Sequence, residues 1–187
     1  MNKKFLLSLI ICFMMISSIA NAENFVPIAD GVGAWKFLNN WGYESCWNKN
    51  NVMQDGTPGM ITYFVFIPSA SSGLGDINVN NPEISTRFGV VDIVTFPDSG
   101  EVCGIRLVFN SRSPNPSKTL GDAFAAIIGR NNFNADKSKF DYAFSQVMSG
   151  SKYVTYYSEN MGRNYMIAYM RLKDDPDFYK LAVTAFI

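Results

Sequence analysis

The sequence predicts a single α+β domain in which an antiparallel sheet of about six strands carries its helices on one face. Two groups of three strand-like runs, rich in Val, Ile, Phe and Tyr, are bounded by clusters of Gly, Asn, Asp and Pro. Between the groups lie two runs whose apolar residues recur at helical spacing, and a shorter such run precedes the first group. The resulting order, helix–βββ–αα–βββ, is typical of an α+β domain rather than of alternating β and α units.

The N-terminus has the three parts of a cleaved secretory signal. Lys3 and Lys4 precede a continuous apolar run, which ends on the small residues Ala-Asn-Ala at Ala22. We therefore expect residues 1–22 to be removed, residues 23–187 to form one domain, and the product to be periplasmic or secreted. No later apolar run has the length of a bilayer span, so no transmembrane segment is expected.

The first element expected after the signal is a short helix over Asp30–Trp41. Asp30 stands at the N-cap position, and Asn and Gly residues follow the apolar positions and end the helix. This phase of the helix predicts that Trp35 belongs to the core. The row of apolar positions expected on the buried side is Val32, Trp35 and Leu38.

The segment Gly42–Gly59 is rich in Asn, Gly and Pro, which predicts irregular chain. Met60–Ile67 then has the composition of a buried strand. After it come about twenty residues of turn formers without periodicity, a length that in compact domains is usually functional or disordered.

The runs "RFGVVDIVTF" and "VCGIRLVFN", joined by "PDSGE", predict a β-hairpin. If Phe96 pairs with Val102 across the connection, Asp92 lies directly opposite Arg106. A charge inside a valine-rich strand is costly unless it is paired, so this register predicts a cross-strand ion pair. The alternative is a binding or catalytic role for Asp92 and Arg106.

Two amphipathic helices are expected next, over "TLGDAFAAIIGRNN" and "NADKSKFDYAFSQVMSG". Thr119 and Asp122 have capping-box spacing in the first, and Gly129 and Gly150 end the two helices. The expected buried stripes are Leu120, Phe124, Ile127 and Ile128 in the first helix and Phe140, Ala143, Phe144 and Val147 in the second.

The C-terminal runs "KYVTYYS", "RNYMIAYMRL" and "FYKLAVTAFI" are joined by turn formers and predict an antiparallel meander. If Tyr156 pairs with Tyr165, one face of this meander carries Tyr156, Tyr165 and Tyr169. That face is either a recognition surface or the face that receives the helices, and the pattern alone does not separate the two.

Two cysteines remain after the signal, Cys46 and Cys103. Exported compartments are usually oxidising, so a disulfide between them is expected, and the hairpin register turns Cys103 toward the core. A nucleophilic Cys46 is disfavoured because the chain has no histidine to generate the thiolate.

The absence of histidine is the most restrictive feature of the composition. It removes Ser-His-Asp and Cys-His hydrolysis and histidine-ligated metals. No phosphate or dinucleotide loop is complete, and the acidic run "KDDPD" is better explained as a turn than as a calcium loop. The 16 basic and 16 acidic residues are interspersed, which argues against a nucleic-acid partner. We therefore predict no catalytic set, cofactor or metal site.

The remaining candidate site is aromatic. A disulfide at Cys46 would hold Trp41, Tyr43 and Trp47 on a tethered loop, and Trp and Tyr are enriched in interface hot spots. The alternative is that the tryptophans are simply core residues.

Three functional hypotheses follow from this content. The first is a non-catalytic module that binds another protein, such as a periplasmic inhibitor or immunity-type protein. The second is a carrier of a small apolar or glycan ligand in a pocket between sheet and helices. The third is a histidine-free cell-wall hydrolase that uses Glu44 or Asp92 with Arg106.

Overall fold

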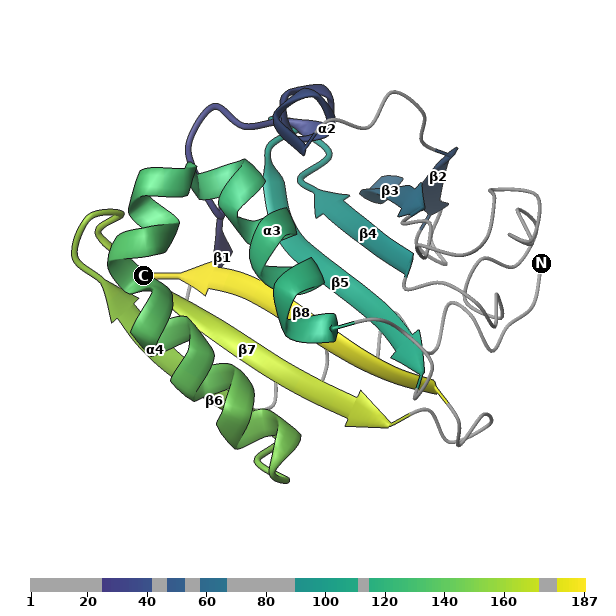
Figure 1. Ribbon diagram of the computed structural model, residues 1–187. Helices are drawn as coiled ribbons and strands as arrows, with labels where there is room; N and C mark the ends of the chain where they lie inside the picture. The colour runs from purple at the N-terminus through teal and green to yellow at the C-terminus, as the bar shows by residue number, and fades with distance from the viewer. Residues whose placement is uncertain (1–24, 42–46, 53–57, 67–89, 111–114, 172–177) are drawn as a thin grey trace.

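The computed structural model describes residues 25–41, 47–52, 58–66, 90–110, 115–171 and 178–187 (Figure 1). In chain order the helices and strands are β1 (Phe25–Val26), α2 (Ala34–Trp41), β2 (Trp47–Val52), β3 (Pro58–Phe66), β4 (Val90–Thr95), β5 (Val102–Asn110), α3 (Pro116–Ile128), α4 (Arg130–Met148), β6 (Tyr153–Ser158), β7 (Arg163–Arg171) and β8 (Phe178–Phe186). The strands form one eight-stranded antiparallel sheet in the order β2-β3-β4-β5-β8-β7-β6, and β1 pairs with β8.

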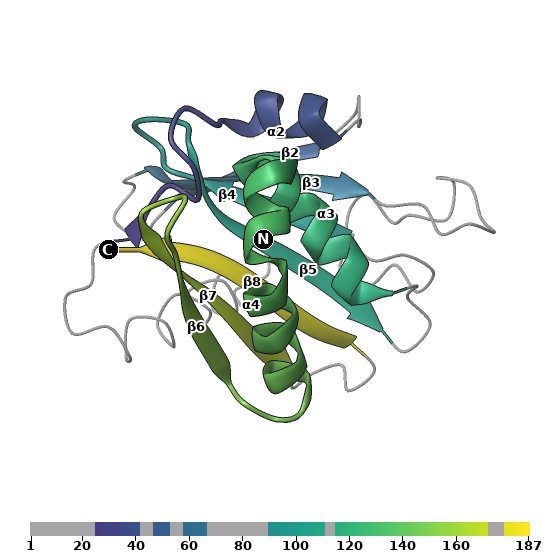
Figure 2. The same cartoon turned by 60° about the vertical axis from the view of Figure 1, so that its left-hand side comes forward.

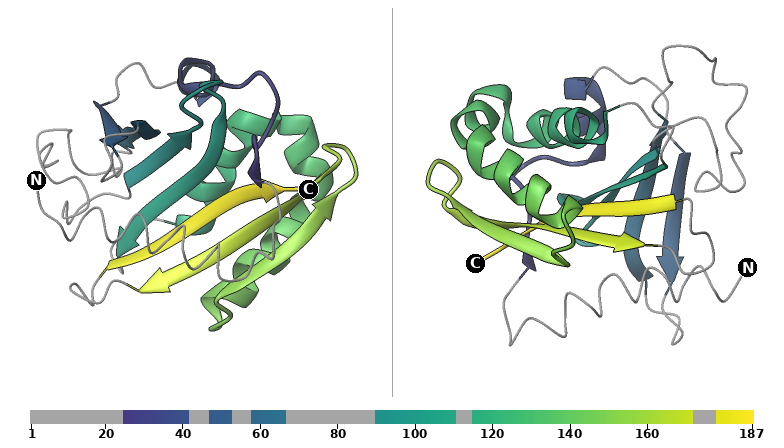
Figure 3. Two further views of the ribbon diagram at one scale, coloured as in Figure 1. Left: turned by 180° about the vertical axis from the view of Figure 1, so that it is seen from behind. Right: turned by 60° about the horizontal axis from the view of Figure 1, so that its bottom comes forward.

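The fold class predicted from the sequence is confirmed. The six expected strands are β3 to β8, and they include the β4–β5 hairpin and the β6-β7-β8 meander. The helices lie on one face of the sheet (Figures 2 and 3), where α3 packs against β5, α4 packs against β6 and β7, and α2 packs against α3. We call this the helix face of the sheet and the opposite one the far face. None of the described helices is both long enough and apolar enough to cross a bilayer.

β2 corrects the expectation of irregular chain over Gly42–Gly59, because Trp47–Val52 pair with β3. Asn-rich segments have low intrinsic strand propensity. β2 lies at the end of the sheet, however, and the backbone of β3 supplies its hydrogen bonds. Local composition carries no information about that partner strand.

Aromatic rings fill the space between the helices and the helix face. The ring centroid of Phe124 in α3 lies 4.8 Å from that of Tyr165, 5.9 Å from Phe140 and 6.1 Å from Phe133. All four side chains are buried. The stripes predicted for the two helices are confirmed, with Phe144 at the margin of the core and the others buried: Leu120, Phe124, Ile127, Ile128, Phe140, Ala143 and Val147.

The start of α3 differs from the predicted capping box. Asn115 is the N-cap, with its side chain accepting a hydrogen bond from the Lys118 N–H, and the helix begins at Pro116. The Asp122 carboxylate instead accepts hydrogen bonds from the Lys118 ammonium at 2.5 Å and the Arg130 guanidinium at 2.9 Å. Burial raises the pKa of Asp122, but these hydrogen bonds outweigh it and hold the pKa below its ordinary value. Gly129 ends α3 as expected, at φ 87°, a backbone region that residues with a Cβ rarely adopt.

α2 is shorter and turned differently from the prediction. It begins at Ala34, and its buried side is Ala34, Phe37 and Leu38, with Trp41 packed at the margin of the core. These positions form an i, i+3, i+4, i+7 row, which leaves Trp35 on the opposite side with 65% of its surface exposed. The expectation that Trp35 lies in the core is therefore wrong. Asp30 is not the N-cap but pairs with Arg163 at 2.9 Å.

The β4–β5 register places Asp92 opposite Arg106, as predicted. Nearer the turn, the register shifts by one residue, so Val102 pairs with Thr95 rather than with Phe96. This β-bulge leaves Cys103 as the additional residue of β5. Cys103 is buried, but the contiguous hydrophobic core includes Val102 instead.

Candidate functional site

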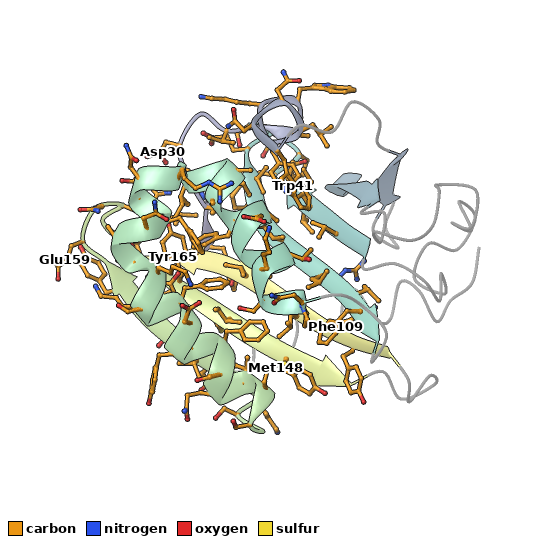
Figure 4. The ribbon with its side chains drawn as sticks, viewed as in Figure 1. Asp30, Trp41, Phe109, Met148, Glu159 and Tyr165 are labelled. Atoms are coloured by element: carbon orange, nitrogen blue, oxygen red, sulfur yellow. The ribbon has the colours of Figure 1, made fainter. Side chains whose placement is uncertain are left out.

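The aromatic loop predicted from the sequence falls only partly within the described residues. Tyr43 and Cys46 lie outside them. Trp41, at the end of α2, packs its ring against Phe37 with a centroid distance of 5.2 Å, and Figure 4 shows it beneath the helix. Trp41 is thus largely a core contact, while its predicted companion Trp47 begins β2.

The sheet register brings three predicted site residues into one row across four strands. Trp47 pairs with Phe64, Phe64 with Asp92, and Asp92 with Arg106. The residues beside Arg106 in β5 belong to the core on the helix face, so the alternation of a strand places Arg106 on the far face. Trp47, Asp92 and Arg106 therefore share a row, although they are separated along the chain.

Two cations are buried on the far face. Arg106 keeps 5% of its surface exposed and Lys180 keeps 2%. They are diagonal neighbours, because Arg106 pairs with Ala182 and Val108 pairs with Lys180. Buried cations persist only with compensating charges or hydrogen bonds. This part of the far face therefore contains polar interactions that serve either the function or the stability of the protein. The predicted ion pair between Asp92 and Arg106 agrees with the register and stays a prediction.

The second predicted set, on the meander, lies on the helix face. Tyr156 pairs with Tyr165 as the sequence predicts. Tyr165 is completely buried beneath α4 (Figure 4), and its hydroxyl donates to the Ile28 carbonyl at 2.8 Å. Tyr156 and Tyr169 are partly buried and pack against the same core. These positions favour the second reading of that face, in which it receives the helices.

A buried carboxylate was not identified from the sequence. Asp136 of α4 is 4% exposed and accepts a hydrogen bond from the hydroxyl of Ser158, which has no exposed surface. The Lys139 ammonium lies 3.6 Å from the same carboxylate, and the Met161 N–H donates to the Ser158 hydroxyl. Its position in the sequence was the signal that could have identified it, since Asp136 stands one helical turn before Phe140 on the buried stripe. This cluster fastens the β6–β7 turn to α4.

The electrostatics of the interior disfavour proton transfer near neutral pH. Burial, followed by the nearby Asp136 carboxylate, raises the pKa of Tyr156 above its ordinary value, and burial likewise raises the pKa of Tyr165 despite the opposing charge of Arg163. Burial also raises the pKa of the Cys103 thiol to about 12. That thiol donates to the Val94 carbonyl at 3.4 Å. Each of these groups stays protonated at pH 7 and is a poor base or nucleophile.

The large exposed apolar residues are the other candidate surface. Trp35 projects from α2, whose other side is fixed to the core. A second group belongs to α4 and β6, which pack together: Tyr142, Met148, Tyr153 and Tyr157. Within the described residues, no group of acidic or cysteine side chains has the arrangement of a metal site.

Comparison with known proteins assigns no family: no family model matches the chain, and no curated protein or solved structure is significantly similar to it.

Proposed function

We propose that the chain is an exported, non-catalytic module that binds another protein, of the inhibitor or immunity type. The observation that carries this proposal is Trp35, a tryptophan with 65% of its surface exposed. Burying a tryptophan at an interface removes a large apolar area from water, and Trp is the residue most typical of interface hot spots.

Trp35 is held by a rigid support. α2 is anchored by Phe37 and Leu38 in the core and by Asn40, whose amide donates to the Ala126 carbonyl of α3 at 2.8 Å. Because the helix is already ordered, a partner that covers Trp35 loses little conformational entropy of this chain on binding.

The two other hypotheses receive less support. A carrier needs an internal pocket, but aromatic rings in mutual contact occupy the described space between helices and sheet. A hydrolase needs an accessible acid and base, whereas Arg106 is buried and Glu44 lies outside the described residues.

The test is binding from the exported fraction of the source cells. The mature chain should retain a protein at fixed stoichiometry, and Trp35→Ala should weaken that complex at least about 10-fold by biolayer interferometry with the purified partner. Ile187→Ala removes an exposed apolar side chain elsewhere and should bind as the wild type does. Equal binding by both variants would exclude the α2 surface, and the absence of any saturable partner would contradict the proposal.

Export and the disulfide belong to the same proposal. We expect the exported chain to begin at Glu23 and to contain a bond between Cys46 and Cys103. Intact mass without reductant should show the loss of one pair of hydrogens relative to the reduced chain. An unprocessed N-terminus would contradict export, and two alkylatable thiols in the unfolded, unreduced chain would contradict the disulfide.

A further inference from the structure

β6 is an end strand of the sheet, and its outward backbone groups can be identified. The Tyr169 N–H donates to the Lys152 carbonyl at 2.9 Å, so this pair is a hydrogen-bonded one. Hydrogen-bonded and non-hydrogen-bonded pairs alternate along an antiparallel ladder. The N–H and C=O groups of Tyr153, Thr155 and Tyr157 therefore point out of the sheet edge.

The same edge gathers exposed apolar side chains. Of six large exposed apolar residues in the described part of the chain, four belong to β6 and the adjoining α4. Tyr153 and Tyr157 stand on β6, on the far face, and Tyr142 is 63% exposed on α4. In Figure 4, Glu159 marks one end of this edge and Met148 lies toward the other end of α4. An open strand edge with apolar side chains is a template for pairing with another strand.

We propose that β6 pairs in antiparallel fashion with β6 of a second copy of this chain, with a two-fold axis at Thr155. In that register Thr155 faces Thr155 of the second copy, and Tyr153 faces Tyr157 of the second copy on both sides of the axis. Every outward N–H and C=O of these residues then meets a complementary group. Thr–Thr and aromatic–aromatic cross-strand pairs are both favourable, so the strand is its own complement.

The charges at the ends of this interface also match. Lys152 of the second copy lies opposite Ser158, which is bonded to Asp136, and next to the exposed Glu159. With Lys139, which lies 3.6 Å from Asp136, each end gathers two carboxylates and two ammonium groups. The register therefore places no unbalanced charge at either end.

α4 extends the contact on the helix face. Asp136 lies level with Ser158, and the Lys139 ammonium donates to the Tyr157 carbonyl at 3.0 Å. A helix rises about 1.5 Å per residue and a strand about 3.3 Å, so Tyr142 lies roughly level with Thr155. The two copies of Tyr142 then approach the two-fold axis together, where their exposed rings are covered. A C₂ pairing closes the open edge without creating a new one.

Sedimentation velocity over a range of concentrations tests the pairing in the complete mature chain. We expect a monomer–dimer equilibrium. Thr155→Pro should raise the dimer Kd at least about 10-fold, because it removes a donor that each copy directs across the axis. The lost N–H points away from β7, so the variant should keep the fold and its circular dichroism spectrum. Thr155→Ala keeps the N–H and should dimerise nearly as well as the wild type.

Cysteine crosslinking tests the register. Thr155→Cys should give a covalent dimer under mild oxidation, with peptide mapping showing a bond between the two introduced residues, because directly opposed Cα atoms lie about 5.5 Å apart. Tyr157→Cys is the matched control, since its two copies are four register steps apart, roughly 13 Å, beyond the reach of a disulfide.

A monomer at every concentration would overturn the proposal, and so would a dimer that Thr155→Pro leaves intact or crosslinking of equal yield at both positions. A strand of a different protein on this edge would appear as a monomeric chain that forms a mixed complex sensitive to Thr155→Pro, which also excludes the second copy. Trp35→Ala should leave the dimer unchanged, so the result is independent of the proposed function.

Discussion

Two tyrosines that face each other across β6 and β7 show how burial and hydrogen bonding set the contribution of a single residue to the stability of the fold. The Tyr165 hydroxyl donates to Ile28, whereas the buried Tyr156 hydroxyl has no hydrogen-bond partner among the described residues. A buried polar group without a partner costs free energy, and a paired one returns part of that cost. The two hydroxyls should therefore have opposite effects on stability.

Replacing each tyrosine with phenylalanine tests this contrast. Tyr165→Phe should lower the free energy of unfolding by about 1–2 kcal/mol, because it leaves the Ile28 carbonyl buried without its donor. Tyr156→Phe should leave the free energy of unfolding unchanged or raise it by up to about 1 kcal/mol. Urea denaturation of both variants provides the measurement, and a larger loss in Tyr156→Phe than in Tyr165→Phe would show that the assignment is reversed.

The Cys103 thiol predicts a dependence on alkaline pH in the reduced chain. Its pKa rises from an ordinary 9.0 to about 12 on burial, so between these values the unfolded chain loses a proton that the native chain keeps. Stability contributed by the protonated thiol is present below pH 9 and declines as the pH rises toward 12. Relative to Cys103→Ala, the reduced wild type should lose about 1–2 kcal/mol of unfolding free energy between pH 9 and 10.5.

Denaturation curves of both reduced proteins at several pH values provide that comparison. Both proteins contain the same tyrosines, so the effect of tyrosine ionisation cancels in the difference. A constant difference between the two proteins would contradict a buried thiol. The oxidised wild type should lack this pH dependence if Cys103 is bonded to Cys46.

At the scale of elements, α4 and the β6–β7 hairpin are joined by one buried polar contact. The Ser158 hydroxyl donates to Asp136 and accepts from Met161, so the helix and the turn share a hydrogen-bonded connection. The same helix carries an exposed acidic residue, Asp141, paired with Lys137 at the surface. The two carboxylates differ mainly in burial, which makes them a matched pair.

Asp136→Ala should lower the free energy of unfolding by about 2–3 kcal/mol, because the Ser158 hydroxyl then remains buried without its acceptor. Asp141→Ala should cost less than about 1 kcal/mol, as expected of an exposed ion pair. Hydrogen exchange should show the loss of protection in Asp136→Ala concentrated in β6 and β7. Equal destabilisation by the two variants would contradict the importance of the buried contact.

At the scale of the whole molecule, the segment from β1 to α2 joins the β4–β5 hairpin to the β6-β7-β8 meander. Ile28 is completely buried and its N–H donates to the Val102 carbonyl at 2.8 Å. Arg163 of β7 donates to the Pro27 carbonyl and pairs with Asp30. β1 also continues the pairing of β8 at Phe186. The segment therefore contacts β5 of the hairpin and both β7 and β8 of the meander.

A chain that begins at Asp30 should therefore be less stable than one that begins at Glu23 by about 3–5 kcal/mol, through the loss of Ile28 burial and several hydrogen bonds. A chain that begins at Phe25 keeps β1 and should match the longer chain. Thermal and urea unfolding of the three forms provides the measurement, and full stability in the shortest form would contradict this role.

The success of the sequence predictions follows the range of the interactions involved. The Tyr156–Tyr165 register was predictable because it depends on one short turn and a period-two pattern. The Asp92–Arg106 pair was predicted correctly from a turn pairing, Phe96 with Val102, that the structure replaces with Thr95–Val102 and a compensating β-bulge. The side of α2 that faces the core was not predictable, because Trp35 and Trp41 are both apolar. Only packing decides which of the two rotations of the helix buries its apolar side. Asp136 was missed for a related reason: its partner Ser158 lies on a separate element.

The sequence alone specifies the α+β class, the hairpin, the meander and the buried stripes of α3 and α4, since local periodicity and turn residues encode them. It also predicted export and the absence of histidine chemistry. Four features emerge only in the folded chain: the pairing of β5 with β8, the strand β2, the exposure of Trp35 and the position of β6 at an edge of the sheet. These features depend on contacts between residues far apart in the chain, which no local pattern specifies.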